Sequence, residues 1–210
     1  MKSPMNYGPA IFAGAFLTLA SSWCGLILAP YLQYGRLSEV HIEQTDRNYP
    51  EAAFGSAARG REIYRANGCI YCHSQQVRPE GFGDDIERGW GKRRSVSRDY
   101  IHDKPVFLGT MRTGPDLANI GLRQTSIEWH LTHLYNPQIT SAGSIMPPFR
   151  FLFEVRKIGQ APSSDALQLA SKFAPKAGYQ VVASQDAKDL VAYLLSLHAD
   201  ASLPEAPVSP

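Results

Sequence analysis

The pentapeptide CIYCH at positions 69–73 constrains this 210-residue chain more than any other feature. Two cysteines that are separated by two residues and followed directly by a histidine form the attachment signature of a c-type haem. With this spacing, each thiol reaches one vinyl group of the same porphyrin, and the histidine presents its imidazole to the iron. The sequence therefore predicts one haem c, bound covalently through Cys69 and Cys72, with His73 as the proximal iron ligand.

A Cys-x-x-Cys pair also occurs in zinc sites and in thioredoxin-like redox centres. A zinc site of four thiolates is excluded because the only other cysteine is Cys24, which lies in an apolar segment. A redox pair is expected beside a βαβ pattern, and the sequence shows none. Because the haem would use two of the three cysteines, no pair remains for a structural disulfide.

The amino-terminal region contains no Asp, Glu, Lys, Arg or His from Ser3 to Tyr34. As a helix, residues 10–34 would span about 38 Å at about 1.5 Å per residue, enough to cross about 30 Å of hydrocarbon. A cleaved signal peptide is the alternative, but the segment is long for one and only Lys2 precedes it. We predict a single-pass transmembrane anchor over 10–34, after a cytoplasmic amino terminus over 1–9.

The predicted haem also orients the chain. Covalent haem attachment in bacteria takes place on the outer side of the cytoplasmic (inner) membrane. We therefore expect the anchor in that membrane and the rest of the chain in the periplasm. A polar connector over 35–55 would lead to a cytochrome domain over 56–200, and the proline-rich residues 201–210 are predicted to form a disordered tail.

The helical patterns of the predicted domain are separated by long loops. Ser56 is a candidate amino-terminal cap for the first helix, and Thr125 with Glu128 matches a Thr-x-x-Glu capping box. The predicted helices cover 57–67, 125–135, 165–173 and 186–198. The expected fold class is therefore all-α.

The order of the helices is similar to that of class I c-type cytochromes. In these proteins a first helix leads into the haem motif and crosses a last amphipathic helix. In this sequence Gly60 would allow a close approach, with Tyr64 and Tyr193 packing at the crossing. We predict a class I cytochrome c-like domain with long loops behind one transmembrane helix.

A six-coordinate haem needs a second axial ligand, usually Met or His. Met146 lies in GSIMPPF, where two prolines would hold the thioether with little motion. His130 and His133 compete with it, since they lie three residues apart on one face of a predicted helix. We predict Met146 as the distal ligand. Met111 would lie on the proximal side, where it cannot be the distal ligand.

The segment RTGPDL at 112–117 resembles the cytochrome c loop whose proline carbonyl accepts a hydrogen bond from the proximal histidine. On this basis Pro115 would orient His73. Arg112 flanks the same loop and is a candidate partner for a haem propionate. The basic run from Lys92 to Arg98 is either a solvated loop or a contact to propionates or to anionic groups of a partner. The net charge of +2 is too small to indicate a nucleic-acid partner.

The haem motif is part of a longer match. Residues 68–79, GCIYCHSQQVRP, closely resemble the mono-haem c subunit (subunit II) of cbb3-type cytochrome c oxidases, the C family of haem–copper oxidases. Further similarities follow in the same order, at Asp103, Pro105, 112–117, Gly121, Trp129, His130, 133–137, Met146 and Pro147. Residues 150–185 show no such similarity.

The resemblance implies a function. The chain would pass single electrons to the catalytic haem–copper subunit, which reduces oxygen, and a further c-type cytochrome subunit would supply them. Cys69 and Cys72 would anchor the haem, His73 and Met146 would bind the iron, and Pro115 would orient His73. The chain itself would contain no oxygen-reducing site.

Three other functions fit parts of the pattern. One is the haem c subunit of a nitric oxide reductase, against which the HSQQVRP extension argues. A second is a membrane-tethered haem sensor for a gas, which would need an open sixth position. A third is a free-standing anchored shuttle, which would need a long flexible connector. Residues 35–54 are long enough but are not rich in Gly and Ser, which argues against this function.

Overall fold

The computed structural model describes residues 7–43 and 45–208. The chain divides into two compact units, Met1–Val40 and His41–Pro210. Part of the predicted cytoplasmic segment, residues 1–6, and part of the predicted tail, residues 209–210, lie outside the described residues.

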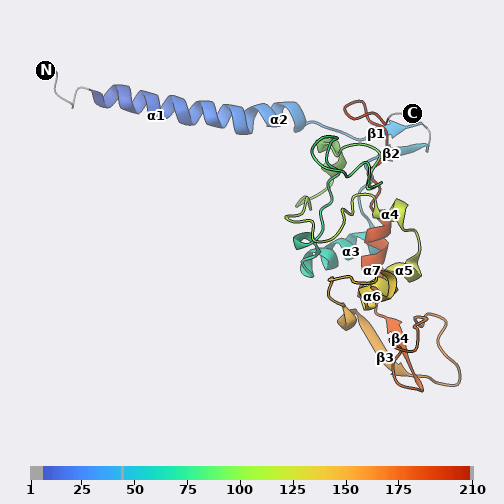
Figure 1. Ribbon diagram of the computed structural model, residues 1–210. Helices are drawn as coiled ribbons and strands as arrows, with labels where there is room; N and C mark the ends of the chain where they lie inside the picture. The colour runs from blue at the N-terminus through green and yellow to red at the C-terminus, as the bar shows by residue number, and fades with distance from the viewer. Residues whose placement is uncertain (1–6, 44, 209–210) are drawn as a thin grey trace. The chain divides into compact units, whose positions relative to one another are not determined.

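The first unit contains a helix over Gly8–Tyr34, made of α1 (Gly8–Trp23), a π-helical segment (Cys24–Leu28) and α2 (Ala29–Tyr34) (Figure 1). Pro30 has no N–H, and its ring would collide with the Leu26 carbonyl in a regular α-helix. The π-helical segment widens the helix at this position. Within the described part of the chain, this helix alone is long and apolar enough to cross a membrane. The predicted anchor is thus found as a helix that begins two residues earlier.

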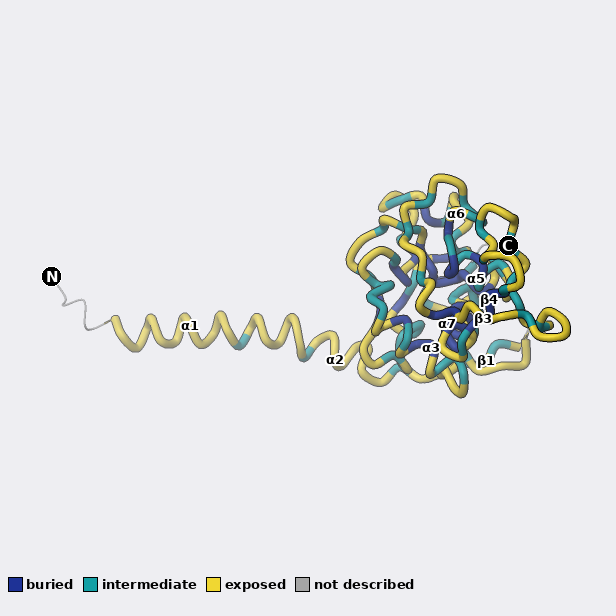
Figure 2. Tube along the Cα trace, turned by 90° about the horizontal axis from the view of Figure 1, so that it is seen from below, coloured by how far each residue is buried: buried dark blue, intermediate teal, exposed yellow. Residues whose placement is uncertain are grey.

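The second unit is built around α3 (Gly55–Ala66) and α7 (Gln185–Ser196), which pack together as predicted (Figure 1). A Cβ added to Gly60 would lie 1.9 Å from the Asp189 carbonyl oxygen, so only glycine allows this approach. The rings of Tyr64 and Tyr193 meet edge to face, with centroids 5.4 Å apart. Both tyrosines are buried, and buried residues also dominate the inner face of α7 (Figure 2).

Two of the predicted helix caps are wrong. The helix α3 begins at Gly55, so Ser56 lies inside it and accepts a hydrogen bond from Arg59 at 2.9 Å. The helix α5 (Ile127–Tyr135) is capped by Ser126, whose hydroxyl accepts from the Trp129 N–H at 3.1 Å. It begins two residues after Thr125, the residue predicted as its cap. The short helices α4 (Ile120–Arg123) and α6 (Pro137–Thr140) flank α5.

The chain also contains strands, so its fold is mainly helical, as predicted, but not plainly all-α. Strands β1 (Val40–Ile42) and β2 (Arg47–Tyr49) form one two-stranded sheet. Strands β3 (Phe153–Lys157) and β4 (Tyr179–Ala183) form a second, antiparallel sheet, in which Val155 pairs with Val181. The helix predicted over 165–173 is absent because this backbone pairs with β4 instead, through a hydrogen bond from Leu167 to Val181 of 2.9 Å.

The described residues of the predicted disordered tail are packed against the domain. Leu203 and Ala206 are buried, and Glu205 accepts a hydrogen bond from Arg98 at 2.6 Å. Apolar side chains among the prolines explain this difference, since they give the tail a surface to bury.

Candidate haem c site

The two motif cysteines lie on one tight turn directly after α3. Gly68 adopts a left-handed backbone conformation, with φ of 68°, and leads into a 3-10 turn over Cys69–Tyr71. Both Cys72 and His73 donate backbone hydrogen bonds to the Cys69 carbonyl. The thiols of Cys69 and Cys72 are free, Cys72 is exposed, and burial raises the pKa of the Cys69 thiol to about 11. The turn therefore carries two thiols and the adjacent imidazole on one short segment.

The imidazole of His73 is held by the carbonyl of Pro115. His73 Nδ1 lies 2.8 Å from the Pro115 oxygen, so this nitrogen carries the proton and donates it. The lone pair of Nε2 is then left for a metal ion. Burial lowers the pKa of His73, while the hydrogen bond to Pro115 acts in the opposite direction. The arrangement favours a neutral imidazole, which is the form that binds iron.

Two glycines make room for this imidazole and its backbone. A Cβ on Gly114 would lie 2.2 Å from His73 Cε1, and a Cβ on Gly109 would lie 2.4 Å from the His73 carbonyl oxygen. Gly109 also has a left-handed φ of 87°. Neither glycine was predicted to have a role, although Gly114 stands beside Pro115 in the RTGPDL segment. With two thiols on one turn and a neutral imidazole in a glycine cradle, the residues present fit a covalently bound haem.

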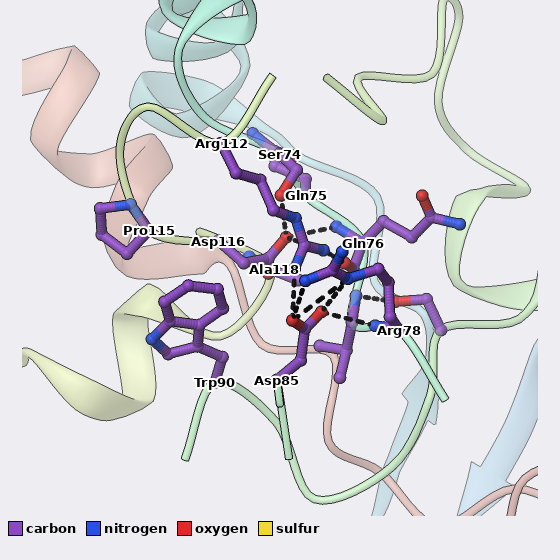
Figure 3. Close-up of polar contacts among 12 residues, drawn as sticks. Ser74, Gln75, Gln76, Arg78, Asp85, Trp90, Arg112, Pro115, Asp116 and Ala118 are labelled. Carbon is purple, nitrogen blue, oxygen red and sulfur yellow. Dashed lines mark hydrogen bonds and ion pairs between the residues drawn. The ribbon is translucent and has the colours of Figure 1, made fainter. Parts of the chain in front are cut away.

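The residues that follow His73 are tied to the rest of the domain (Figure 3). Ser74 and the Gln76 N–H donate to the Asp116 carboxylate at 2.6 and 2.7 Å. The Gln75 side chain accepts from Tyr193 on α7 at 3.0 Å. Thus SQQ, the part of HSQQVRP directly after the histidine, links the attachment turn to the RTGPDL segment and to the α3–α7 core.

Arg112, the predicted propionate partner, makes ion pairs inside the protein. Its guanidinium donates to the fully buried Asp85 carboxylate and to the Gln76 carbonyl, and it lies 3.7 Å from the Asp116 carboxylate. Burial alone would raise the pKa of Asp85, but hydrogen bonds from Arg112 and Arg78 outweigh this and lower the pKa to about 2. The charge of Arg112 is therefore shared with two buried carboxylates (Figure 3).

Two arginines of the basic run from Lys92 to Arg98 form ion pairs with acidic side chains of the same chain, whereas Lys92 and Arg94 are exposed. Arg93 is buried and forms an ion pair of 2.7 Å with Asp99, which also accepts from Tyr49 at 2.7 Å. Arg98 pairs with Glu205 at 2.6 Å. These arginines and Asp99 therefore connect the end of β2 and the carboxyl-terminal segment to the basic run.

Met146 lies in the segment 141–149, between α6 and the 3-10 turn Arg150–Leu152. Its side chain is half-buried and packs against the hydrophobic core. The Met146 N–H donates to the Ser144 hydroxyl at 3.3 Å, and the Phe149 N–H donates to the Leu134 carbonyl at 2.8 Å. Met111 is 61 % exposed, which leaves its thioether out of the core.

The competing histidines have other partners on α5 and near it. His130 Nε2 donates to the Gln124 carbonyl at 2.9 Å, and His133 Nδ1 lies 2.5 Å from the Thr140 hydroxyl. The His133 ring stacks on Trp129, with centroids 4.7 Å apart. Burial, assisted by His73 and His130 nearby, lowers the pKa of His133 to about 4. Among residues 7–43 and 45–208, no group of three or more His, Cys, Asp or Glu side chains is arranged to hold a metal ion.

Comparison with known proteins identifies one family. The family model described as cytochrome c oxidase, mono-haem subunit/FixO, matches residues 39–189. The match confirms the resemblance that was predicted from GCIYCHSQQVRP, and it extends over residues 150–185, where the sequence analysis found no similarity. No curated protein matches the chain.

Proposed function

Since the chain belongs to the family of cytochrome c oxidase mono-haem subunits (FixO), we propose that it carries single electrons to the catalytic subunit of a cbb3-type terminal oxidase. The observation that supports this most directly is the hydrogen bond from His73 to Pro115 beside the two free thiols. It leaves a neutral imidazole nitrogen next to two anchoring groups, as a covalent haem requires. The partners would be the haem–copper catalytic subunit and a further c-type cytochrome subunit as electron donor.

The chain's own residues would hold and tune the haem, which when bound supplies one-electron redox chemistry at its iron. Cys69 and Cys72 would anchor it by thioether bonds, and His73 would bind the iron through Nε2. Pro115 would fix the imidazole plane and increase its basicity by accepting the Nδ1 proton in a hydrogen bond. Met146 would provide the sixth ligand, from a core-packed position between two prolines and α6.

Haem attachment is tested with cysteine variants of the full chain. We expect covalently bound haem in the wild type and in Cys24→Ser, which changes an exposed cysteine outside the motif. We expect none in the double variant Cys69→Ser, Cys72→Ser. Haem staining of the chain after denaturing electrophoresis measures this, and covalent haem in the double variant would contradict the assignment.

The oxidase assignment is tested by purifying the native complex from membranes. We expect this chain to co-purify with a subunit that contains haem b and copper and that reduces oxygen. Co-purification with a copper-free enzyme that reduces nitric oxide would contradict the proposal. Rapid binding of carbon monoxide by the reduced chain would also contradict it, because a gas sensor needs an open sixth position at the iron.

The membrane orientation is part of the proposal. The helix Gly8–Tyr34 would span the bacterial inner membrane once, and the second unit would lie in the periplasm. An alkaline phosphatase fused after Tyr34 should be active, since this enzyme folds in the periplasm. A matched fusion after Ser3 should be inactive. The reverse pattern would overturn the orientation.

A further inference from the structure

Asp116 is a fully buried carboxylate beside the candidate haem site. Its Oδ2 accepts hydrogen bonds from the Ser74 hydroxyl at 2.6 Å and from the Gln76 N–H at 2.7 Å, and its Oδ1 accepts from the Ala118 N–H at 2.9 Å. Arg112 lies 3.7 Å away, and Figure 3 shows its guanidinium between Asp116 and Asp85. The carboxylate is thus surrounded by donors and held in one position.

The place of Asp116 in the chain connects it to His73. Ser74 directly follows His73, and Asp116 directly follows Pro115, the residue that accepts the hydrogen bond from His73. The hydrogen bond from Ser74 to the Asp116 carboxylate therefore joins the same two segments as the bond from His73 to Pro115, one residue further along each. Two backbone hydrogen bonds join these segments as well. The Gly114 N–H donates to the Cys72 carbonyl at 2.9 Å, and the Leu117 N–H donates to the Ser74 carbonyl at 2.8 Å.

We propose that Asp116 is a positioning residue for His73, which sets the strength of the His73–Pro115 hydrogen bond and whose negative charge stabilises the oxidised state of a haem bound there. The inference rests on the haem attachment proposed above. A fixed separation between Ser74 and Pro115 keeps the Nδ1 proton aligned with the carbonyl, which makes the imidazole a stronger donor to iron. A stronger donor and a nearby negative charge both favour the ferric state, so both lower the midpoint potential.

The effect of nearby charges on His73 agrees with the proposal that Asp116 stabilises positive charge at this site. Burial lowers the pKa of His73, whereas the bond to Pro115 and the charge of Asp116 act to raise it. Arg123 donates to the backbone carbonyl of Asp116 and opposes that effect. Asp85 is equally buried and shares Arg112, but it accepts its hydrogen bonds from Arg78 and Arg112 and not from Ser74 or Gln76.

Asp85 therefore provides a matched control. Asp85→Asn and Asp116→Asn each remove one buried negative charge beside Arg112. Of the two aspartates, only Asp116 follows Pro115 and accepts a hydrogen bond from Ser74, the residue after His73. A third variant, Ser74→Ala, removes one bond of the contact without changing any charge.

The midpoint potential of the full-length, haem-containing chain tests the inference. We expect an upward shift in Asp116→Asn that clearly exceeds the shift in Asp85→Asn, and a smaller upward shift in Ser74→Ala. Equal shifts in the two aspartate variants would overturn the inference. If Asp116→Asn does not accumulate with haem, the midpoint potential of Ser74→Ala tests the inference instead. A midpoint potential of Ser74→Ala equal to that of the wild type would overturn the inference. Failure of the haem assignment itself is distinguishable, because the wild type would then show no c-type absorption spectrum.

Discussion

The segment after Cys72 and the segment around Met146 are restrained by different means. Each residue from Cys72 to Gln76 makes a hydrogen bond to residues 108–118, and these bonds include two to the buried Asp116 carboxylate. The hydrogen bonds of the loop 141–147 are all of short range. They run from Ser141 to the Pro137 carbonyl, from Ser144 to the Ser141 carbonyl, from the Gln138 side chain to the Ser144 carbonyl and, at 3.3 Å, from the Met146 N–H to the Ser144 hydroxyl. We call the first region, 69–78 with 108–118, the His73 side, and the second, α5 to residue 149, the Met146 side.

The difference indicates how the site would handle a change of charge at iron. The His73 side is fixed by the polypeptide itself, through hydrogen bonds to the buried Asp116 carboxylate and to backbone carbonyls, although the buried Gln75 Nε2 has no hydrogen-bond partner. The Met146 side is held mainly by apolar packing and by proline stiffness. We infer that the His73 side would be formed without the haem, whereas the Met146 side would gain its last restraint if Met146 binds the iron as proposed.

Gly114→Ala should disrupt the His73 side, and of the substitutions that compare the two sides it should cause the largest loss in the free energy of unfolding. The added Cβ would lie 2.2 Å from His73 Cε1, so the imidazole must leave its place against Pro115. We expect a loss of about 3 kcal/mol or more in the free energy of unfolding and poor haem incorporation, as in strong overpacking. Gly159→Ala is the control, since its Cβ would meet no atom within 4 Å. Denaturant unfolding followed by haem absorbance measures both, and similar values for the two variants would contradict the comparison.

Met146→Ala should affect the Met146 side and leave the His73 side in place. Loss of the half-buried side chain should cost about 2 kcal/mol, since truncation of a fully buried Met costs about 2–5 kcal/mol. The midpoint potential should fall, because a thioether ligand raises it. The oxidised protein should lose its sulfur-to-iron charge-transfer band, and the reduced protein should begin to bind carbon monoxide. Persistence of that band would exclude Met146 as the ligand.

The sequence was sufficient for the parts of the molecule that short motifs encode. It predicted the family, the α3–α7 crossing at Gly60 and the placement of Pro115 beside His73. It did not predict the strands β3 and β4, because their pairing partners lie more than twenty residues apart. Nor did it show that the basic run pairs with Asp99 and Glu205, since ion pairs depend on tertiary contacts. The caps of α3 and α5 were each misplaced by a short distance, because several neighbouring residues have similar capping ability.

Acid should weaken the Met146 side through His133. Its pKa is about 4 in the folded chain, against an ordinary value of about 6.5, so the unfolded state binds more protons between these values. The contribution of the neutral His133 to the free energy of unfolding is fully present above about pH 6.5 and is lost as the pH falls toward 4. With allowance for partial exposure of the ring, we expect a loss of about 1–2 kcal/mol over this interval. The free energy of unfolding, measured at several pH values, should depend less steeply on pH in His133→Gln than in the wild type. Parallel slopes for His133→Gln and wild type would exclude this histidine as the cause.

Two serine substitutions compare the hydrogen bonds of the two sides most finely. On the His73 side, Ser95 accepts from the N–H of the buried Val77 at 2.9 Å, so Ser95→Ala leaves a buried donor without its partner and should cost about 1 kcal/mol. On the Met146 side, Ser144 accepts from the Met146 N–H at 3.3 Å in a half-buried loop, where water can replace it, so Ser144→Ala should cost less than about 0.5 kcal/mol. Denaturant midpoints of the two variants measure the difference. An equal or larger loss in Ser144→Ala would mean that this hydrogen bond, and not apolar packing, holds the loop of Met146.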